Sequence, residues 1–502
     1  MDERGPSPRL SRRGFVRLAG GLVASGVGMS LVAACGGGGG GAAPAATTAP
    51  AAPATAAASQ PTTAPKPATS PQAATASPQA STASPLATTA PAAQTAPLAV
   101  AKQGSTLRIL LWSHFVPAYD EWFDNFAKDW GGKNGVDVKV DHIRNADLPA
   151  RFASETSAGA GHDLFEFQAI IQTHTYEEKL VDVSDIADAV GKKYGGWIDM
   201  AKNVGLVNGT WRAVLSYFIA QPNIYRKDYF DQVGAPYPDD YVTLLESSRK
   251  LKAAGFPCGQ ALSNCNDGNH NWRSVLYSFG GSETSQDGKT ITINSPETLA
   301  ALKFGGDLFR DGMTDEVFSW DDAGNNRLLL SGRGSWIDNA TSAYLTARDQ
   351  APDVFEHCEI ALNPKGPGDK GGRRNTVDPN AWAIWKFSPN ADTAKAFLLA
   401  WYDAHLDAAV ASNGYNSPAL NDLWKKPMPG LDKDPKLAIM QEWKDTAFVY
   451  GWQGPITQAM EEVQATFVMP NMFARVARGD TPEAALAWGE GEYKRIFSKY
   501  KL

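Results

Sequence analysis

The sequence predicts an α/β fold for the part of the chain from Ser105 to Leu502. Short strand-like segments, apolar or alternating, are separated there by segments with helical spacing of apolar residues. Regular alternation of strand and helix is typical of a sheet covered by helices. The chain has 502 residues, of which 43% are hydrophobic, so its length allows two or three domains with a packed core. A single small module is excluded.

The first elements follow one another without a gap. Residues 107–112 form a short apolar run, and residues 118–130 place aromatic side chains at helical spacing. Residues 136–140 alternate as a second strand, residues 148–157 are helical, and residues 164–167 form a third strand. This order predicts strands packed side by side, with helices on their faces.

Later helices are marked by their capping residues. Asp240 opens a helix that Gly255 closes, because Asp caps helix N-termini and Gly accepts the left-handed backbone that ends many helices. Ser295 and Thr481 each precede a Pro-Glu pair and open two further helices. The last third of the chain is therefore expected to be mostly helical.

The N-terminus has the pattern of an export signal. Arg12 and Arg13 precede a charge-free stretch at residues 18–34, and small residues lead to Cys35. A charged segment, a short apolar segment and a small-residue cut site make a signal peptide. The arginine pair resembles a twin-arginine signal, and residues 32–35 resemble a lipobox, so we expect residues 1–35 to be a signal peptide ending at a lipidated Cys35. An uncleaved membrane helix is the alternative, but about 17 residues is short for one.

Residues 36–104 are predicted to be a disordered tether. A glycine run is followed by Ala, Pro, Thr, Ser and Gln, and Lys66 is the only charged residue up to Val100. Such a composition has nothing to bury and does not fold. As a flexible coil the tether would span about 45 Å. It would hold residues 105–502 near a membrane while letting them move.

Charge and motifs exclude several classes of protein. The first 101 residues contain six Lys/Arg and two Asp/Glu, which leaves 41 and 52 for the rest and a net charge of −11 there. Such acidity argues against nucleic-acid binding. The sequence has no nucleophile elbow, zinc-protease motif or phosphate loop, and its seven histidines lack metal-site spacing. We therefore expect no cofactor, no metal and no enzyme. Asp321 and Asp322 keep a glycoside hydrolase open as an alternative, although adjacent acids often serve a helix N-terminus.

Five short motifs carry a family resemblance that covers the chain from Leu107 to its end. In this order they resemble the extracellular solute-binding proteins of bacterial ABC importers, in the carbohydrate-binding group that includes maltose-binding protein. They are residues 110–112, Gly161-His162-Asp163, residues 225–230 with Gly234-Ala235-Pro236, residues 328–336 around Ser331-Gly332-Arg333-Gly334, and Ser388-Pro389-Asn390 before the helix of Ala394 and Phe397. His162 and residues 334–336 depart from the usual family pattern.

The resemblance implies the two-lobed periplasmic-binding-protein fold, with a cleft between the lobes and a helical C-terminal region. Lobe I would comprise about 105–217 and 380–412, and lobe II about 222–376 and 418–502. Crossings are expected near residues 216–222, 376–382 and 411–418. Such a protein captures a mono- or oligosaccharide by lobe closure and delivers it to the ABC permease subunits in the membrane. It would be exported, lipid-anchored at the outer face of the cytoplasmic membrane, and monomeric.

Other ligands and roles stay open at this point. A polyol, a glycerol phosphodiester or a peptide is compatible with the same resemblance. A sensory or adhesive module that uses the fold without transport is also compatible with it. A sugar site needs aromatic platforms for the C–H faces of the ring and polar groups such as Asp and Asn for its hydroxyls.

Candidate ligand residues follow from that chemistry and from the rule that open α/β sheets bind ligands beyond the carboxyl ends of their strands. At predicted strand ends lie Trp112, Ser113, His114, Phe167, Gln168, Asp338 and Asn339. At predicted crossings or their loops lie Asp378, Asn380, Trp382 and Tyr415. Trp272 and Trp320 are at predicted helix starts, where the family often places ligand aromatics.

Three cysteines remain beyond Cys35. An exported protein meets an oxidising compartment, so Cys258 and Cys265 are a possible disulfide that closes a short loop. In the chain-entropy description such a bridge contributes about 2 to 3 kcal/mol. Cys358, beside a strand-like segment, is expected to be a buried thiol.

Overall fold

The computed structural model describes residues 99–425, 428, 431 and 434–501, which belong to one compact unit. The predicted signal peptide, Cys35 and the tether up to residue 98 lie outside the described residues. The last residues of the predicted tether are described and touch the folded chain. Gly104 donates a backbone hydrogen bond to Gly135 (2.7 Å), and the Lys102 amide donates to Thr393 Oγ1 (3.1 Å).

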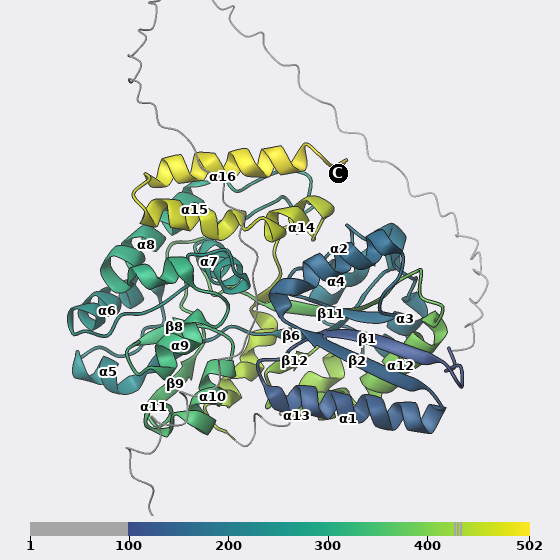
Figure 1. The fold of residues 1–502 in the computed structure, drawn as a ribbon. Helices are drawn as coiled ribbons and strands as arrows, with labels where there is room; N and C mark the ends of the chain where they lie inside the picture. Colours follow the sequence, from purple (N-terminus) through teal and green to yellow (C-terminus); the bar gives the residue numbers. More distant parts are fainter. Residues whose placement is uncertain (1–98, 426–427, 429–430, 432–433, 502) are drawn as a thin grey trace, which may run out of the picture. The chain divides into compact units, whose positions relative to one another are not determined.

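A six-stranded mixed sheet is the centre of one half of the fold, which we call the first half (Figure 1). Its order is β12-β6-β11-β3-β1-β2; β1 pairs in parallel with β2 and β3, and β11 runs antiparallel to β3 and β6. The strands are β1 (Thr106–Trp112), β2 (Asp137–Ile143), β3 (Leu164–Gln168), β6 (Val214–Ile219), β11 (Asp378–Ile384) and β12 (Asn416–Pro418). Strands buried on both faces need apolar residues, which explains the apolar residues of β1, where Arg108 is the one exposed position.

Helices cover the six-stranded sheet. They are α1 (Pro117–Asn134), α2 (Leu148–Ala158), α3 (Ser184–Lys193), α4 (Met200–Gly205), α12 (Ala391–Asp403) and α13 (His405–Ala411). Aromatic side chains fill the space between sheet and helices. Phe123 of α1 stacks on Trp382 of β11 with 5.8 Å between ring centroids, and Phe397 of α12 packs beside it at 5.9 Å.

A three-stranded antiparallel sheet of order β8-β7-β9 forms the second half, with helices around it. Its strands are β7 (Asn223–Arg226), β8 (Trp336–Asp338) and β9 (Cys358–Ala361). The helices are α5 (Lys227–Gln232), α6 (Tyr241–Ala253), α7 (Asn266–Ser278), α8 (Pro296–Gly312), α9 (Gly324–Leu330), α10 (Ser342–Gln350) and α11 (Pro352–Phe355). Near the C-terminus, α14 (Gln458–Ala465), α15 (Val468–Ala477) and α16 (Pro482–Phe497) pack together and against α7 and α8 (Figure 1).

The chain passes between the two sheets three times. It leaves the first sheet after Ile219 and enters β7 at Asn223. It returns through the short strand β10 (Asn375–Thr376), which pairs with β13 (Ala447–Phe448) and leads directly into β11. It leaves again after β12 and reaches α14. The remaining two-residue strands, β4 (Leu206–Val207) and β5 (Thr210–Trp211), form a hairpin, and the predicted lobe boundaries stay predictions.

The elements predicted from periodicity and capping are confirmed. Asp240, Ser295 and Thr481 each accept a hydrogen bond from a backbone amide at the start of α6, α8 and α16. The predicted end of the second strand is wrong, because β2 continues past Val140 to Ile143. Its last residues pair with the last residues of β1, which extends the edge strand beyond its clearly alternating segment.

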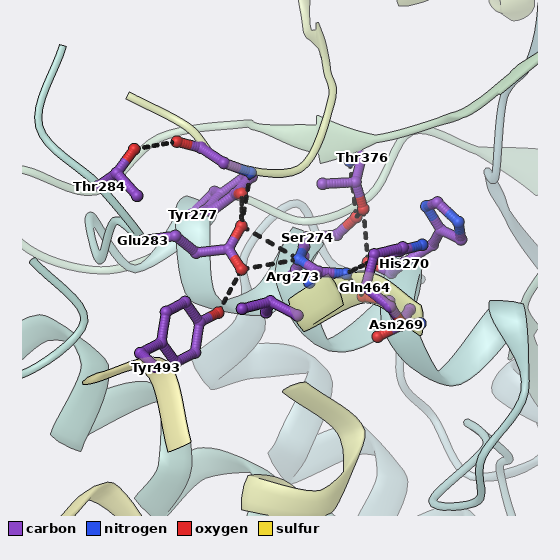
Figure 2. A network of polar contacts seen from close by, with 12 residues as sticks. Asn269, His270, Arg273, Ser274, Tyr277, Glu283, Thr284, Thr376, Gln464 and Tyr493 are labelled. Carbon is purple, nitrogen blue, oxygen red and sulfur yellow. Dashed lines mark hydrogen bonds and ion pairs between the residues drawn. The ribbon is translucent and has the colours of Figure 1, made fainter. Parts of the chain in front are cut away.

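Helix α7 is buried along all 13 of its residues, including Arg273. Figure 2 shows how this charge is matched: Arg273 Nε donates to both carboxylate oxygens of Glu283, at 3.0 and 3.1 Å. Glu283 also accepts hydrogen bonds from Tyr277 and Tyr493 and from the Gly451 amide (2.8 Å). Because an unpaired charge is very costly to bury, this network makes the deep position of α7 possible.

The predicted disulfide between Cys258 and Cys265 does not form. Both are buried free thiols, as is Cys358, which agrees with the prediction for Cys358. Cys258 lies against Gly312 and Ser248, whereas Cys265 stands at the start of α7 beside Ser263. Burial raises the pKa of Cys258 to about 12, so this thiol is unreactive at neutral pH.

None of the helices in the described residues is long and apolar enough to cross a membrane. No cluster of three His, Cys, Asp or Glu side chains among the same residues could hold a metal ion.

The Arg273–Glu283 pair predicts a large loss of stability in Glu283→Gln. The substitution keeps the shape of the side chain but leaves Arg273 buried without a counter-charge, so the free energy of unfolding should fall by about 3 to 5 kcal/mol. Tyr493→Phe removes one hydrogen bond to the same carboxylate and should cost only about 1 kcal/mol. Urea unfolding of both variants measures the difference. Equal stability of Glu283→Gln and the wild type would show that the pair does not stabilise the fold.

Candidate functional site

A cavity of about 850 Å³ lies where the carboxyl ends of β1, β2 and β3 meet the helices of the second sheet. A smaller, deeper pocket of about 10 Å³ shares five of its lining residues, and we call the two together the central cavity. The shared residues are Phe115, Asn145, Gln168, Asn266 and Asp322. Both halves of the fold therefore contribute to one site.

The first sheet supplies one wall of the central cavity from its strand ends. Ser113 and His114 follow β1, Gln168 ends β3, and Tyr415 directly precedes β12. Asp378 reaches the same edge because it begins β11, which runs antiparallel to β3. The strand order thus gathers side chains that are far apart in the sequence.

His114 packs inside this wall and is uncharged at neutral pH. Its Nε2 lies 3.0 Å from Asn416 Oδ1, and its ring packs at 4.6 Å from Trp112 and 5.0 Å from Tyr415 between centroids. Burial lowers the pKa of His114 to about 4 because the charged imidazolium loses its hydration. At neutral pH this histidine therefore brings no positive charge to the cavity.

The second half supplies the opposite wall from the starts of α7 and α9. Asn266 and Asp267 begin α7, and Trp320 and Asp322 precede α9. The Trp320 ring lies where a Cβ atom on Gly324 would overlap it. A larger residue there would displace the ring, so the observed position of Trp320 requires glycine at residue 324.

Polar contacts join the two walls. Asn145 Nδ2 from the first half donates to Asp322 Oδ2 of the second at 2.9 Å. His270 of α7 contacts the carboxylate of Asp378, which also accepts from Gln221 Nε2 at 3.0 Å. These contacts hold the two halves together across the cavity.

The carboxyl groups of the second wall have raised pKa values. The pKa of Asp267 lies well above its usual range because the group is buried and because Asp322 and Asp378 are negatively charged neighbours. Burial also raises the pKa of Asp322, although hydrogen bonds to its carboxylate favour the charged form. The pKa of Asp338 is raised by burial behind this wall.

Seven of the residues predicted from the sequence line the central cavity. Their role in binding stays a prediction, but the structure brings them together. They are Ser113, His114, Gln168, Trp320, Asn339, Asp378 and Tyr415.

Four other predicted residues, Trp112, Phe167, Trp272 and Trp382, do not line the central cavity, because their rings are covered by core packing. Trp382 is fully buried between Phe123 and Trp401, and Trp272 stacks on Phe473 at 4.4 Å. Phe167 is fully buried in the core of the first sheet. Trp112 is buried with its Nε1 donating to Tyr217 (3.1 Å).

Asp338 and Asn380 also do not line the cavity. Asp338 accepts hydrogen bonds from Gln260 (3.3 Å) and Asn363 (3.2 Å) inside the second half. Asn380 is fully buried within β11, where its Nδ2 donates to the backbone of Asp378 (3.2 Å). Both residues have internal hydrogen-bond partners, so the structure does not bring them to the cavity with the other predicted residues.

Several lining residues were not predicted. The sequence pattern does not place Asn145 at a strand end, because β2 ends three residues after its alternating segment. It does not place Asn266 and Asp267 at a helix start either, because α7 begins six residues before Trp272, the predicted start. Asp322 was read as a helix-terminal charge, although its carboxylate faces the cavity. Only the strand-end rule, applied to the true end of β2, could have found Asn145.

A second cavity, of about 530 Å³, lies away from these strand ends. It is lined by α4 and the segment from Lys444 to Gly454. It lacks the convergence of strand ends and helix starts from both halves, so the central cavity is the candidate functional site.

Comparison with known proteins identifies the family and the fold of the chain. Residues 117–404 match the family model described as bacterial extracellular solute-binding protein. No curated protein sequence is significantly similar to the chain.

Solved structures share the fold at low sequence identity. Maltose-bound MalE3 of T. maritima is 20% identical, covers 79% of this chain and 100% of its own, and has a TM-score of 0.68. A sugar transporter from Arthrobacter chlorophenolicus A6 with bound laminaribiose is 17% identical, with 78% and 99% covered and a TM-score of 0.68. A solute-binding protein from Agrobacterium radiobacter K84 in complex with ribitol is 18% identical, with 78% and 99% covered and a TM-score of 0.66. These similarities show the two-lobed periplasmic-binding-protein fold.

The packing around Trp320 predicts that Gly324→Ala destabilises the protein. The new methyl group overlaps the Trp320 ring, and overpacking of this kind costs about 1 to 3 kcal/mol. Gly491→Ala is the matched control, since Gly491 also lies in a helix but has open space around it. The control should be neutral or up to about 1 kcal/mol more stable, because Ala favours helix. Thermal unfolding of the two variants measures the difference. Equal melting temperatures would contradict the packing of the Trp320 ring against Gly324.

Proposed function

The chain belongs to the bacterial extracellular solute-binding proteins, and on this basis we propose that it is the substrate-binding subunit of an ABC importer for a carbohydrate. Membership of an extracellular family makes it an exported protein. The observation that carries the carbohydrate assignment is the central cavity, which combines aromatic rings with carboxylate and amide groups from both halves of the fold.

The lining suits a polyhydroxylated ligand. Phe115, Trp320 and Tyr415 offer apolar ring surfaces for the C–H faces of a sugar. Asp322 and Asp378 accept hydrogen bonds from hydroxyl groups, and charged acceptors make these bonds stronger. A cavity of about 850 Å³ has room for a mono- or disaccharide. The neighbours whose names include maltose, laminaribiose and ribitol support the same class of ligand.

Capture proceeds by closure of one half on the other. A ligand in the central cavity contacts both walls at once, so it binds the closed arrangement more tightly than an open one and shifts the population toward closure. Asn145 and Asp322, which join the walls in this structure, would then lie directly beside the ligand. The closed protein is the form presented to the permease.

A glycoside hydrolase is the alternative. The pair of Asp321 and Asp322 that kept this alternative open is divided in the structure: Asp321 is exposed and paired with Arg327 at 2.7 Å, and Asp322 lines the cavity. Recovery of an oligosaccharide unaltered after incubation with the protein separates binding from hydrolysis. A sensory or adhesive role is separated from import by loss of sugar uptake when the gene is deleted.

A thermal-shift screen against neutral and amino sugars, polyols and peptides tests the carbohydrate assignment. A ligand at 100 times its dissociation constant adds about 2.7 kcal/mol to the free energy of unfolding, which gives a clear rise in melting temperature. Small-angle scattering from residues 91–502 should show a smaller radius of gyration with the same ligand, because closure brings the halves together. Stabilisation by peptides alone would contradict the assignment.

We further propose that Cys35 carries a lipid anchor and that the protein acts as a tethered monomer. One acyl chain binds membranes only marginally, so stable retention needs the two or more chains that a lipoprotein cysteine receives. Cys35→Ala should leave the protein unprocessed or release it from membranes, as measured by cell fractionation. Wild-type protein that is soluble and carries no lipid in mass spectrometry would refute this anchor.

A further inference from the structure

Two neighbouring carboxylates in the central cavity lack a cationic partner. The backbone amide of Asp267 donates to Asp322 Oδ1 at 3.1 Å, and both residues line the same deep pocket. Their other side-chain hydrogen bonds come from amides: Asn325 Nδ2 donates to Asp267 (2.6 Å) and Asn145 Nδ2 donates to Asp322 (2.9 Å). No Lys, Arg or His in the described part of the chain forms an ion pair with either carboxylate. Asp267 is only 5% exposed, so water cannot fully replace that partner.

The rest of the cavity does not supply the missing positive charge. Asp378 approaches from the first sheet as a third carboxylate, and His270 already contacts it. His114 is neutral at neutral pH because burial lowers its pKa to about 4. Arg144 stands at the exposed rim, where it pairs with Asp147 at 2.9 Å. Burial, together with the like charges of Asp322 and Asp378, raises the pKa of Asp267 well above its usual range.

The unpartnered polar atoms of the cavity point to the same kind of ligand. Gln168 Oε1, Gln221 Oε1 and Asn266 Oδ1 are buried and make no hydrogen bond within the described residues. Their side chains are 6%, 1% and 7% exposed. All three atoms are oxygens, and they line the same cavity as the two carboxylates. Buried acceptors need donors, so the ligand must bring more hydrogen-bond donors than acceptors to this end of the cavity.

A metal ion fits this site less well than an organic cation. No group of three His, Cys, Asp or Glu side chains in the described residues has the geometry to hold one. A primary ammonium group carries three donors and one positive charge on a compact head. It matches a pair of carboxylates flanked by amide oxygens, because hydrogen bonds between charged partners are the strong ones.

We propose, building on the carbohydrate-binding function, that the ligand is an amino sugar whose ammonium group binds between Asp267 and Asp322 while its ring lies along the aromatic side chains of the central cavity. The ammonium removes the repulsion between the two carboxylates, and the hydroxyl groups donate to the unpartnered oxygens. Neutral sugars leave that repulsion in place and bind more weakly.

Matched pairs of ligands test the inference on the full chain. Titration calorimetry at pH 7 compares glucosamine with glucose, and the β-1,4-linked disaccharide of glucosamine with cellobiose. The amino sugar of each pair should bind about tenfold tighter or more, since close charge pairs contribute well over 1.4 kcal/mol, the equivalent of tenfold. N-Acetylglucosamine keeps the nitrogen but loses its charge, so it should bind like glucose. Added salt should reduce the advantage of the amino sugars.

Two variants test whether the preference for the amino sugar depends on the Asp322 carboxylate. Asp322→Asn should remove most of the preference for the amino sugar, whereas Asp315→Asn should keep it, because Asp315 is exposed and away from the cavity but carries the same charge. Thermal unfolding establishes that both variants fold, and the N-acetyl comparison needs no variant.

The possible outcomes separate this inference from the proposed function. Neutral sugars that bind as tightly as their amino counterparts overturn the amino-sugar assignment and leave carbohydrate binding intact. Binding that requires added Ca²⁺ or Mg²⁺ and is lost with chelator also overturns it, in favour of a metal-bridged ligand. Failure of every neutral and amino sugar, with binding of a polyamine or a basic peptide, counts against both.

Discussion

The buried pair of Arg273 and Glu283 is the contact on which the second wall of the central cavity depends. Arg273 lies near the middle of α7, and the first residues of the same helix, Asn266 and Asp267, face the cavity. Glu283 in turn binds Tyr493 of α16 and the amide of Gly451 (Figure 2). The pair therefore fixes the depth of α7, and through it the place of the cavity carboxylates, relative to the C-terminal helices.

A second physical principle governs the cavity itself. Its polar side chains are too buried to be hydrated fully and too numerous to satisfy one another. Asn145 and Asp322 satisfy each other only while the two halves are in contact. Stability of the closed arrangement and recognition of the ligand thus use the same groups, and a change to one affects the other.

Periodicity and capping were enough to predict β1, β2 and β3 of the first sheet and the starts of α6, α8 and α16, because these signals are local. The wall residues Ser113 and Gln168 were predictable from the strand-end rule, and Asp378 from its place at a predicted crossing. Trp382 was not distinguishable from a ligand platform, because whether an aromatic ring is covered by Phe123 depends on tertiary packing. The same holds for the pairing of thiols: two cysteines close in sequence point to different neighbours in the fold.

Glu461 of α14 links the halves without facing the central cavity. Its carboxylate accepts hydrogen bonds from the backbone amides of His174 and Thr175, each at 2.8 Å, and from the Thr175 hydroxyl at 2.6 Å. Part of the free energy of closure is therefore built into the protein and is the same for every ligand. Apparent affinity equals the intrinsic affinity of the closed form multiplied by the fraction of molecules already closed. Evolution can consequently set the ligand concentration at which this protein responds by changing the Glu461 contact, which is away from the central cavity, without altering its choice of ligand.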